Sequence, residues 1–212
     1  MKKLMVLSLT MVLLFSYVTL ASAEVLFGVS AETGKVDLTA DYAGTSYDYS
    51  DSDIVMLNGE LNVFLTRLYV EYGQTDIEQG SFKSYGLKAG WELGPGLLKA
   101  QILGGFQGYK FEDENLAALG GYSVAGLVGG VGLESKIGKM KFYGSALIPL
   151  VVRSQSDKED DNSSSIENYC IGVSYAPIPM LDIFANYRNT KLESNFLTLQ
   201  SEGYTVGAKI SF

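Results

Sequence analysis

Charged side chains recur at alternate positions within several apolar segments of the chain, and their types are those that form ion pairs or line ion pores. The set consists of Glu60, Arg67, Glu71, Lys88, Glu92, Lys99, Lys141, Arg153, Asp182, Arg188 and Lys209. Because unpaired buried charge is costly, opposite charges enclosed on one face should pair and plug the space between them. The excess of seven basic over four acidic groups would favour anions if that space were a narrow pore. The sequence leaves both alternatives open.

Acid–base and nucleophilic catalysis have no evident residues in this chain. It contains no histidine, the usual base or orienting group near neutral pH. A serine without an imidazole partner is a poor nucleophile, and the sequence places no aspartate pair. We therefore expect no enzymatic activity, no catalytic residues and no cofactor.

Two further features invite a chemical interpretation. The acidic stretch SDKEDDNSSS at 156–165 lacks the glycine and the distal glutamate of a calcium-binding loop, so we expect a solvated loop and no metal site. Loose bridging of Mg²⁺ or Ca²⁺ by this stretch is the alternative. Cys170 is the only cysteine, which rules out an internal disulfide. A small inward-facing side chain is expected there, with a redox role as the alternative.

The charged positions belong to segments in which apolar residues recur at every second position. A period of two predicts β-strands with one apolar and one polar face. Ten segments follow the pattern: 25–42, 55–63, 68–72, 85–93, 98–106, 122–128, 140–152, 169–175, 181–187 and 204–212. The apolar parity slips near Gly34, as at a β-bulge. In the later segments, the alternation predicts that Tyr122, Val124, Val128 and Val152 lie on the apolar face.

The connections between these segments fall into two classes. Short turns are predicted near 65–67, 94–96, 135–139 and 177–180, and longer polar loops at 43–53, 74–81, 112–121, 154–167 and 189–203. Membrane β-barrels sort their connections by side in this way. The pattern predicts about ten strands. Eight remain possible if the turn at 65–67 or the unbroken first segment is wrong.

Aromatic residues of the apolar parity gather at the ends of the segments. Phe27, Trp91, Phe142, Tyr175 and Phe212 lie near the short turns, and Tyr42, Tyr72, Tyr85, Tyr122, Tyr169, Tyr187 and Tyr204 near the longer loops. Two belts of rings around an aliphatic band match the two interfaces of a bilayer. Because lipid offers no hydrogen-bond partner, the sheet must close. The predicted fold is an all-β, transmembrane, antiparallel up-and-down β-barrel.

The chain ends on a complete strand, EGYTVGAKISF. Thr205, Gly207, Ile210 and Phe212 resemble the C-terminal assembly signal of Gram-negative outer-membrane proteins. With its alternating strands, the chain resembles the small barrels of the outer membrane protein A and X type, which have eight strands. The resemblance implies the outer membrane as location. It also implies the barrel-assembly machinery, outer-membrane lipid and lipopolysaccharide as partners.

The N-terminus has the features of a secretory signal peptide. A basic start precedes an apolar core at 4–15, and Ala21 and Ala23 stand at −3 and −1 of a cut before Glu24. We expect a signal peptide at 1–23 and a single barrel domain at 24–212. The mature chain would hold 14 basic and 24 acidic residues, a net charge of −10. Such an acidic exported chain is expected to be a poor partner for nucleic acid or anionic lipid.

The functional expectation is an integral outer-membrane barrel that is not an enzyme. Its role would be structural or in surface interaction, with a lumen plugged by charged side chains. One alternative is a narrow pore with a weak preference for anions. Another is an adhesin, because the predicted loops at 42–53 and 189–203 carry Tyr, Phe and Leu among polar residues, as surface-binding loops can.

Overall fold

The computed structural model describes residues 25–63, 65–94, 97–114, 121–156, 160–161 and 164–212. Its elements are β1 (Val25–Tyr42), β2 (Thr45–Val63), β3 (Thr66–Ile77), β4 (Gly80–Leu93), β5 (Leu98–Asp113), β6 (Tyr122–Ile137), β7 (Met140–Ser156), β8 (Asp160–Asp161), β9 (Ser165–Ile178), β10 (Leu181–Glu193) and β11 (Leu197–Ser211). No helix among the described residues has the length and apolar character to cross a membrane. The expected signal peptide, with Ala21 and Ala23, lies outside the described residues and stays a prediction.

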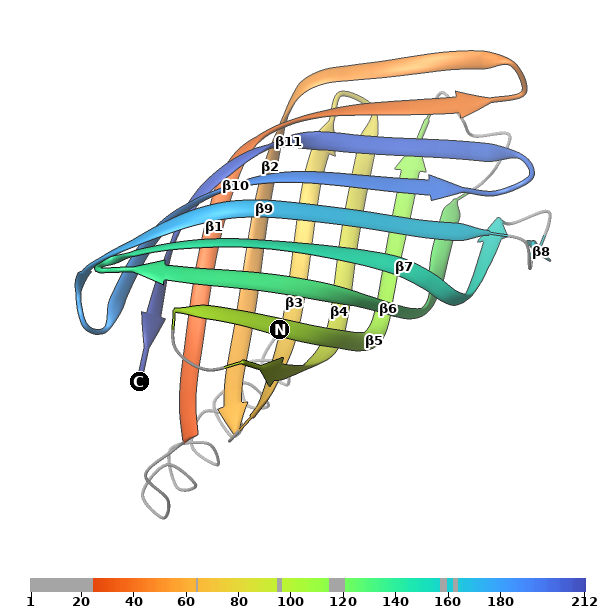
Figure 1. The fold of residues 1–212 in the computed structure, drawn as a ribbon. Helices are drawn as coiled ribbons and strands as arrows, with labels where there is room; N and C mark the ends of the chain where they lie inside the picture. Colours follow the sequence, from red (N-terminus) through yellow and green to blue (C-terminus); the bar gives the residue numbers. More distant parts are fainter. Residues whose placement is uncertain (1–24, 64, 95–96, 115–120, 157–159, 162–163) are drawn as a thin grey trace, which may run out of the picture.

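Ten long antiparallel strands close into a barrel (Figure 1). The sheet runs from β6 through β1 to β11 and on to β7, and β6 pairs with β7 to complete the circle. The short strand β8 pairs with β7. The last strand pairs with the first along its length, from Gly28 opposite Ser211 to Tyr42 opposite Leu197. This closure confirms the predicted barrel of about ten strands. It leaves no open sheet edge, whose backbone N–H and C=O groups would find no hydrogen-bond partner in lipid.

The two ends of the barrel differ in their connections. The short turns and the C-terminus lie at one end, called here the short-turn end, where Phe212 donates its N–H to the Phe27 carbonyl at 2.8 Å. Long hairpins extend from the other, called the hairpin end (Figure 1). The predicted loops there were largely wrong, since the strands continue: β1 and β2 meet at the two-residue turn Ala43–Gly44. Residues 115–120, 157–159 and 162–163 of two other predicted loops lie outside the described residues.

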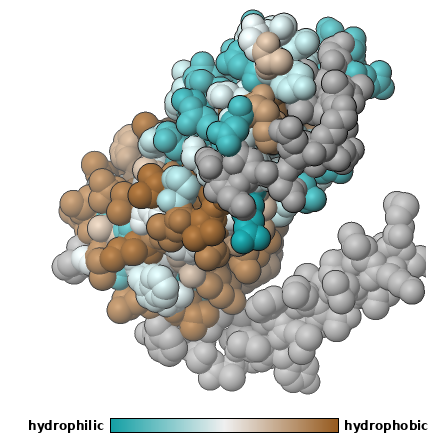
Figure 2. Space-filling model, turned by 90° about the vertical axis from the view of Figure 1, so that its right-hand side faces the viewer, coloured by the Kyte–Doolittle hydropathy of each residue, from teal (hydrophilic) through white to brown (hydrophobic). Residues whose placement is uncertain are grey.

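In the half nearer the short turns, the outer face is apolar and the interior is polar. Exposed aliphatic side chains cover every long strand, among them Leu57, Leu87 and Val206. Figure 2 shows them as a brown band at this end and a largely hydrophilic surface toward the other. Exposed Tyr72 and Tyr204 lie at the hairpin-side border of the band. This half, below that border, is called the membrane half.

In the half nearer the hairpins, called the hairpin half, the arrangement is reversed. The interior is a core of buried apolar residues: Leu38, Ala40, Ile77, Phe82, Tyr109, Phe111, Tyr122, Val124, Val128, Leu147, Val152, Ile166, Leu192, Leu197 and Leu199, with Leu103 below them. Polar residues such as Asp41, Lys110 and Glu202 are exposed on the outer face. The same strands therefore exchange their apolar and polar faces where they leave the lipid.

The hairpin half is built from two layers. Pairing between β2 and β3 begins at Asp53, and pairing between β7 and β9 ends at Leu147, so no described ladder joins the layers beyond these points. One layer contains β3 to β7 and the other contains β9, β10, β11, β1 and β2. Tyr49 of β2 packs edge-on against Phe111 of β5, with ring centroids 6.4 Å apart. The barrel thus continues outward as two sheets packed face to face.

The bulge predicted near Gly34 is wrong. Strand β1 keeps its alternation, and Val36 and Leu38 lie inside because the interior changes there from polar to apolar. A register shift with β2 occurs instead between Val36 and Leu38, opposite Asp51, which has a φ of 59°. Hydropathy alone cannot separate a shifted strand from a straight strand that passes from lipid to water.

The predicted parity of β6 is also wrong. Tyr122, Val124 and Val128 are buried inside the barrel, and the exposed large apolar residues of this strand are Leu127, Val131, Leu133 and Ile137. Glycine and apolar residues occupy both faces of β6, so its alternation was ambiguous. In β7, a register shift against β6 leaves Leu150 and Val151 both exposed and turns Val152 inward, against the prediction.

Candidate functional site: a charged cavity beneath an apolar core

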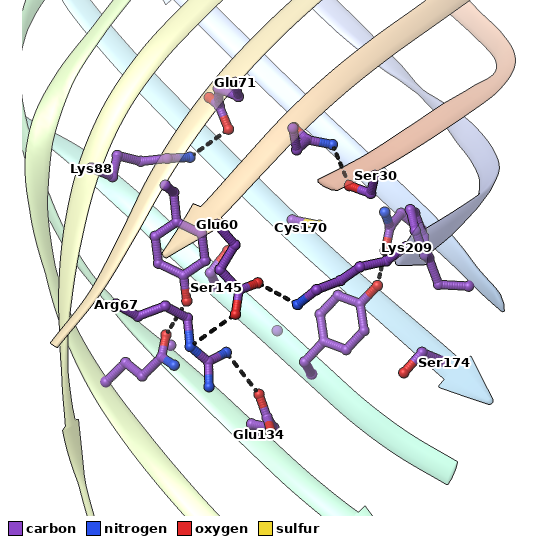
Figure 3. A pocket seen from close by; sticks show the side chains of 18 of the residues that line it. Ser30, Glu60, Arg67, Glu71, Lys88, Glu134, Ser145, Cys170, Ser174 and Lys209 are labelled. Atoms are coloured by element: carbon purple, nitrogen blue, oxygen red, sulfur yellow. Dashed lines mark hydrogen bonds and ion pairs between the residues drawn. The ribbon is translucent and has the colours of Figure 1, made fainter. Parts of the chain in front are cut away.

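A cavity of about 220 Å³ occupies the interior of the membrane half (Figure 3). Of the charges predicted to face the lumen, the structure places Glu60, Arg67, Glu71, Lys88, Lys141, Asp182, Arg188 and Lys209 in its lining. Glu92 and Lys99 are bound to the same group of side chains, because Glu92 pairs with both Arg67 and Lys99. The structure therefore gathers ten of the eleven predicted charges in one interior.

Arg153 does not face the lumen, and its predicted place there was wrong. Its side chain is exposed and alternates with the buried Val152 and Ser154. The register shift in β7 between the partners of Leu127 and Val128 reverses the parity of all later residues of the strand. A bulge of this kind leaves no reliable trace in the hydropathy pattern.

Two lumen carboxylates were missed by the sequence analysis. Glu32 lies on β1 and Glu134 on β6, and both line the cavity. Glu134 was missed because the parity of β6 had been assigned to the wrong face. Glu32 follows the predicted inward parity of β1, so that signal could have found it. With these two added and Arg153 removed, the described residues of the lumen include six acidic and six basic groups, and the basic excess disappears.

Glu32 is the most deeply enclosed of these charges, with a side chain 0% exposed. Arg188 of β10 donates to it at 2.6 Å, Asn58 and Asn186 each donate at 2.9 Å, and Thr205 donates at 2.5 Å. These donors come from β2, β10 and β11. Since a buried carboxylate needs such partners, Glu32 ties four neighbouring strands together around the closure of the barrel.

The residues of the expected assembly signal divide between the two faces of β11. Thr205 points inward to Glu32, whereas Ile210 and Phe212 are exposed on the outer face. Gly207 is pressed against β1, and a Cβ at this position would collide with the carbonyl oxygen of Ala31. The motif thus has local structural reasons in this chain. Recognition by an assembly machinery stays a prediction.

A second ion pair lies toward the middle of the barrel. Lys88 donates to Glu71 at 2.7 Å, and Gln107 donates to the other oxygen of the same carboxylate at 2.8 Å. Figure 3 shows this pair apart from the group around Arg67. Gln107 is itself buried next to the apolar core. Glu71 is therefore neutralised where the polar interior meets the core.

Nearer the short turns, Arg67 is the centre of a larger network (Figure 3). Its guanidinium contacts Glu92, Glu134 at 3.3 Å and Glu60 at 3.4 Å. Further ion pairs extend it: Lys209 to Glu60 at 2.6 Å, Lys99 to Glu92 at 2.8 Å and Lys141 to Glu134 at 3.9 Å. Because the members come from seven strands, the network braces the wall from within and occupies the lumen with paired charges.

The cavity ends at the apolar core. Tyr109 is 2% exposed and stacks on Phe82 with ring centroids 5.7 Å apart. Its hydroxyl accepts a hydrogen bond from Asn168 at 3.1 Å, at the boundary between polar and apolar interior. Leu147 and Ile166 are also fully buried at this level. Together these side chains separate the charged cavity from the hairpin end.

Other residues singled out in the sequence lie in less reactive settings. Cys170 is a free, buried thiol in the cavity lining. Among the described residues, no group of three or more Cys, Asp or Glu side chains is arranged to hold a metal ion. Part of the acidic stretch at 156–165 lies outside the described residues, so its expected solvated loop stays a prediction.

The Tyr, Phe and Leu residues of the predicted binding loops are buried or partly buried. Tyr42, Tyr47 and Phe196 pack against the core, and Leu197 and Leu199 are fully buried within it. The argument that these residues form an exposed adhesive surface was therefore wrong. They are apolar because the hairpin half needs a packed interior.

No family model and no curated protein matches the sequence. Among solved structures, the outer membrane protease OmpT from Escherichia coli is similar, with a TM-score of 0.53, 9% identity and coverage of 91% of this chain and 98% of that one. Neisserial surface protein A gives a TM-score of 0.45, 14% identity and coverage of 88% and 97%. The attachment invasion locus protein Ail of Yersinia pestis gives a TM-score of 0.35 and 13% identity, and the match covers 87% of this chain and 98% of that one. At these identities, likeness to OmpT concerns the fold alone. With its closed barrel and apolar outer band, the chain has the fold of a small outer-membrane β-barrel.

Proposed function

We propose that this protein is a non-conducting, non-enzymatic barrel that anchors a closed two-layered β structure at the cell surface. In an outer-membrane barrel, short turns face the periplasm and longer connections face outward, so the hairpin half would be extracellular. The observation that carries the proposal is the apolar core inside the hairpin half, which fills the barrel above the charged cavity.

The side chains of the lumen also favour a plug over a pore. Six acidic and six basic groups balance, so the charge argument for anion passage no longer applies. Most of these groups are bound to one another, as in the network around Arg67. An ion entering the lumen would have to break such pairs and then enter an apolar core, where its desolvation is costly.

The absence of enzymatic activity is part of the proposal. The sequence contains no histidine to act as a base near neutral pH. The similarity to OmpT does not transfer its protease activity, because 9% identity carries the fold alone. The lumen carboxylates Glu32, Glu60, Glu71, Glu92 and Glu134 are paired with Arg and Lys, which suits them to bracing the wall.

The outer face of the hairpin half supports a role in surface interaction. Asp37, Asp41, Asp48 and Asp53 are exposed on the β1–β2 hairpin, with Lys35 bound to Asp53 at 2.9 Å. The hydrogen bond from Lys35 to Asp53 raises the pKa of this lysine. This face is polar and acidic, so contact through it would be electrostatic. Lipopolysaccharide and an extracellular ligand stay proposed partners.

A planar-bilayer measurement tests the proposal. The purified mature chain should give no steady conductance. The double variant Tyr109→Ala/Phe111→Ala removes two rings from the core and should produce conducting openings, whereas Tyr85→Ala, an exposed ring on the outer face, should not. Steady conductance from the unmodified protein, folded as judged by heat-modifiable gel migration, would reject the plug.

A further inference from the structure

The rim of the barrel at the short-turn end is basic. The exposed charged side chains described there are Lys136, at the end of β6, and Lys139, in the turn that leads to β7. Lys99 lies next to them with a side chain 37% exposed. The neighbouring carboxylates Glu92 and Glu134 point into the lumen and belong to the Arg67 network. Within the described residues, Lys136 and Lys139 therefore present positive charge outward at this rim, whereas Lys99 is paired with Glu92.

Backbone and side-chain contacts join three turns into one continuous rim. The N–H of Lys136 donates to the Leu97 carbonyl at 3.0 Å, which connects the start of β5 with the end of β6. Lys139 donates through Nζ to the Pro177 carbonyl at 3.0 Å and accepts the N–H of Ala176 at 2.9 Å. These contacts hold the ammonium group of Lys139 over the β9–β10 turn and fix its position on the rim.

Large apolar side chains surround the two lysines. Leu97 is 72% exposed and Ile137 is 66% exposed, and Met140, Ile178 and Met180 are exposed as well. Each belongs to a turn or to the adjoining strand end. Aliphatic side chains beside ammonium groups are typical of a position where hydrocarbon meets lipid headgroups, because each part of the surface then has its preferred solvent.

We infer that this rim, defined by Leu97, Lys136, Ile137, Lys139 and Met140, binds the headgroups of anionic phospholipids. The phosphodiester would accept hydrogen bonds from the ammonium groups, and the acyl chains would cover the aliphatic side chains. A soluble anionic polymer would meet the lysines but leave the apolar side chains in water, so the surface fits a lipid better. The inference rests on the membrane insertion contained in the proposed function and is independent of whether the lumen conducts.

Lipid selectivity can be measured in phosphatidylcholine bilayers that contain spin-labelled phosphatidylglycerol or spin-labelled phosphatidylcholine. The fraction of motionally restricted label should show that the protein prefers the anionic lipid. In the double variant Lys136→Gln/Lys139→Gln, this preference should fall, on the order of fivefold for each lysine removed. It should also weaken with added salt, since headgroup contacts at a surface are screened.

The matched control is Lys83→Gln/Lys110→Gln. These two lysines lie on the hairpin half and pair with Glu112, and their removal should leave the preference unchanged. Equal selectivity in both double variants, or none in the unmodified protein, would overturn the inference. Lysine-dependent capture of peptidoglycan fragments without lipid selectivity would assign the rim to a soluble polymer and overturn it as well. Heat-modifiable migration of every variant separates loss of binding from loss of insertion, and conductance is not part of the readout.

Discussion

The membrane half and the hairpin half are made from the same ten strands and have opposite interiors. On β11, Val206 faces outward in the membrane half and is exposed, whereas Leu199 faces inward in the hairpin half and is buried. On β1, Glu32 is enclosed in the lumen. Leu38 lies six residues further along the strand, on the same face, and is buried in the core. Both strands keep their alternation along their length, and the solvent outside decides which parity is apolar.

The comparison also shows how each half is stabilised. In the membrane half, backbone ladders run around the full circle and charged pairs fill the interior. In the hairpin half, the ladders stop at two seams and packing between two layers takes over. Electrostatic pairing therefore braces the part surrounded by lipid, and apolar burial holds the part surrounded by water.

We expect the largest effect from removing Glu32, the most deeply enclosed carboxylate of the lumen. Glu32→Ala leaves Arg188 without its ion-pair partner inside the barrel, which should lower the free energy of unfolding by about 3–5 kcal/mol. Urea unfolding in detergent micelles, followed by the fluorescence of the single tryptophan Trp91, measures it. Glu112→Ala, at an exposed pair on the hairpin half, should cost no more than about 1 kcal/mol. Equal losses in the two variants would contradict the role assigned to Glu32.

Truncation within the core tests the other half. Leu199→Ala should cost about 2–5 kcal/mol because it leaves a cavity between two packed layers. Amide hydrogen exchange should rise first in the hairpin half, with the membrane half still protected. Leu87→Ala on the lipid-facing surface is the control, since lipid fills the space that it vacates. Faster exchange throughout the barrel after Leu199→Ala would argue against two separately stabilised halves.

A lysine placed on the outer face of β11 should show directly that this face changes from apolar to polar along the strand. Val206→Lys puts an ammonium group into the lipid-facing band and should cost about 2–4 kcal/mol near the bilayer midplane. Gln200→Lys, on the same outer face of β11 but in the hairpin half, should be close to neutral. Folding yield and urea unfolding in phospholipid vesicles measure both. If the two lysines were tolerated equally, the outer face would not change solvent along β11.

The smallest effect concerns an exposed pair on the hairpin half. The hydrogen bond from Lys110 at 2.7 Å, with the attraction of its charge, lowers the pKa of Glu112. The pair therefore contributes stability above the ordinary pKa of a glutamate, and this contribution is lost as the pH falls through the lowered value. Titration by NMR should show the pKa of Glu112 rising toward its ordinary value in Lys110→Gln. An unchanged pKa in that variant would mean that the pair is not formed in solution.

Much of the barrel was predictable because lipid imposes a simple rule on strands. Tyr85, Leu87 and Trp91 alternate without interruption and lie outside as predicted, and most charges of the opposite parity lie inside. The rule failed where glycine and apolar residues occupy both faces, as around Val128, and where a bulge reverses a strand, as before Arg153. Those failures hid Glu134 and misplaced Arg153, and together with the overlooked Glu32 they produced an apparent excess of basic groups in the lumen.

By itself the sequence determined the class of fold and predicted about ten strands, with the C-terminal segment as the strand that closes the barrel. Period-two alternation, sorted connections and a complete last strand are local features that lipid requires of any barrel. Only the tertiary structure decided which charges pair, that they balance, and that apolar hairpin residues pack inward instead of lining a binding surface. Pairing and packing depend on which strands become neighbours across the barrel, and residues as far apart as Glu32 and Thr205 meet only when the sheet has closed.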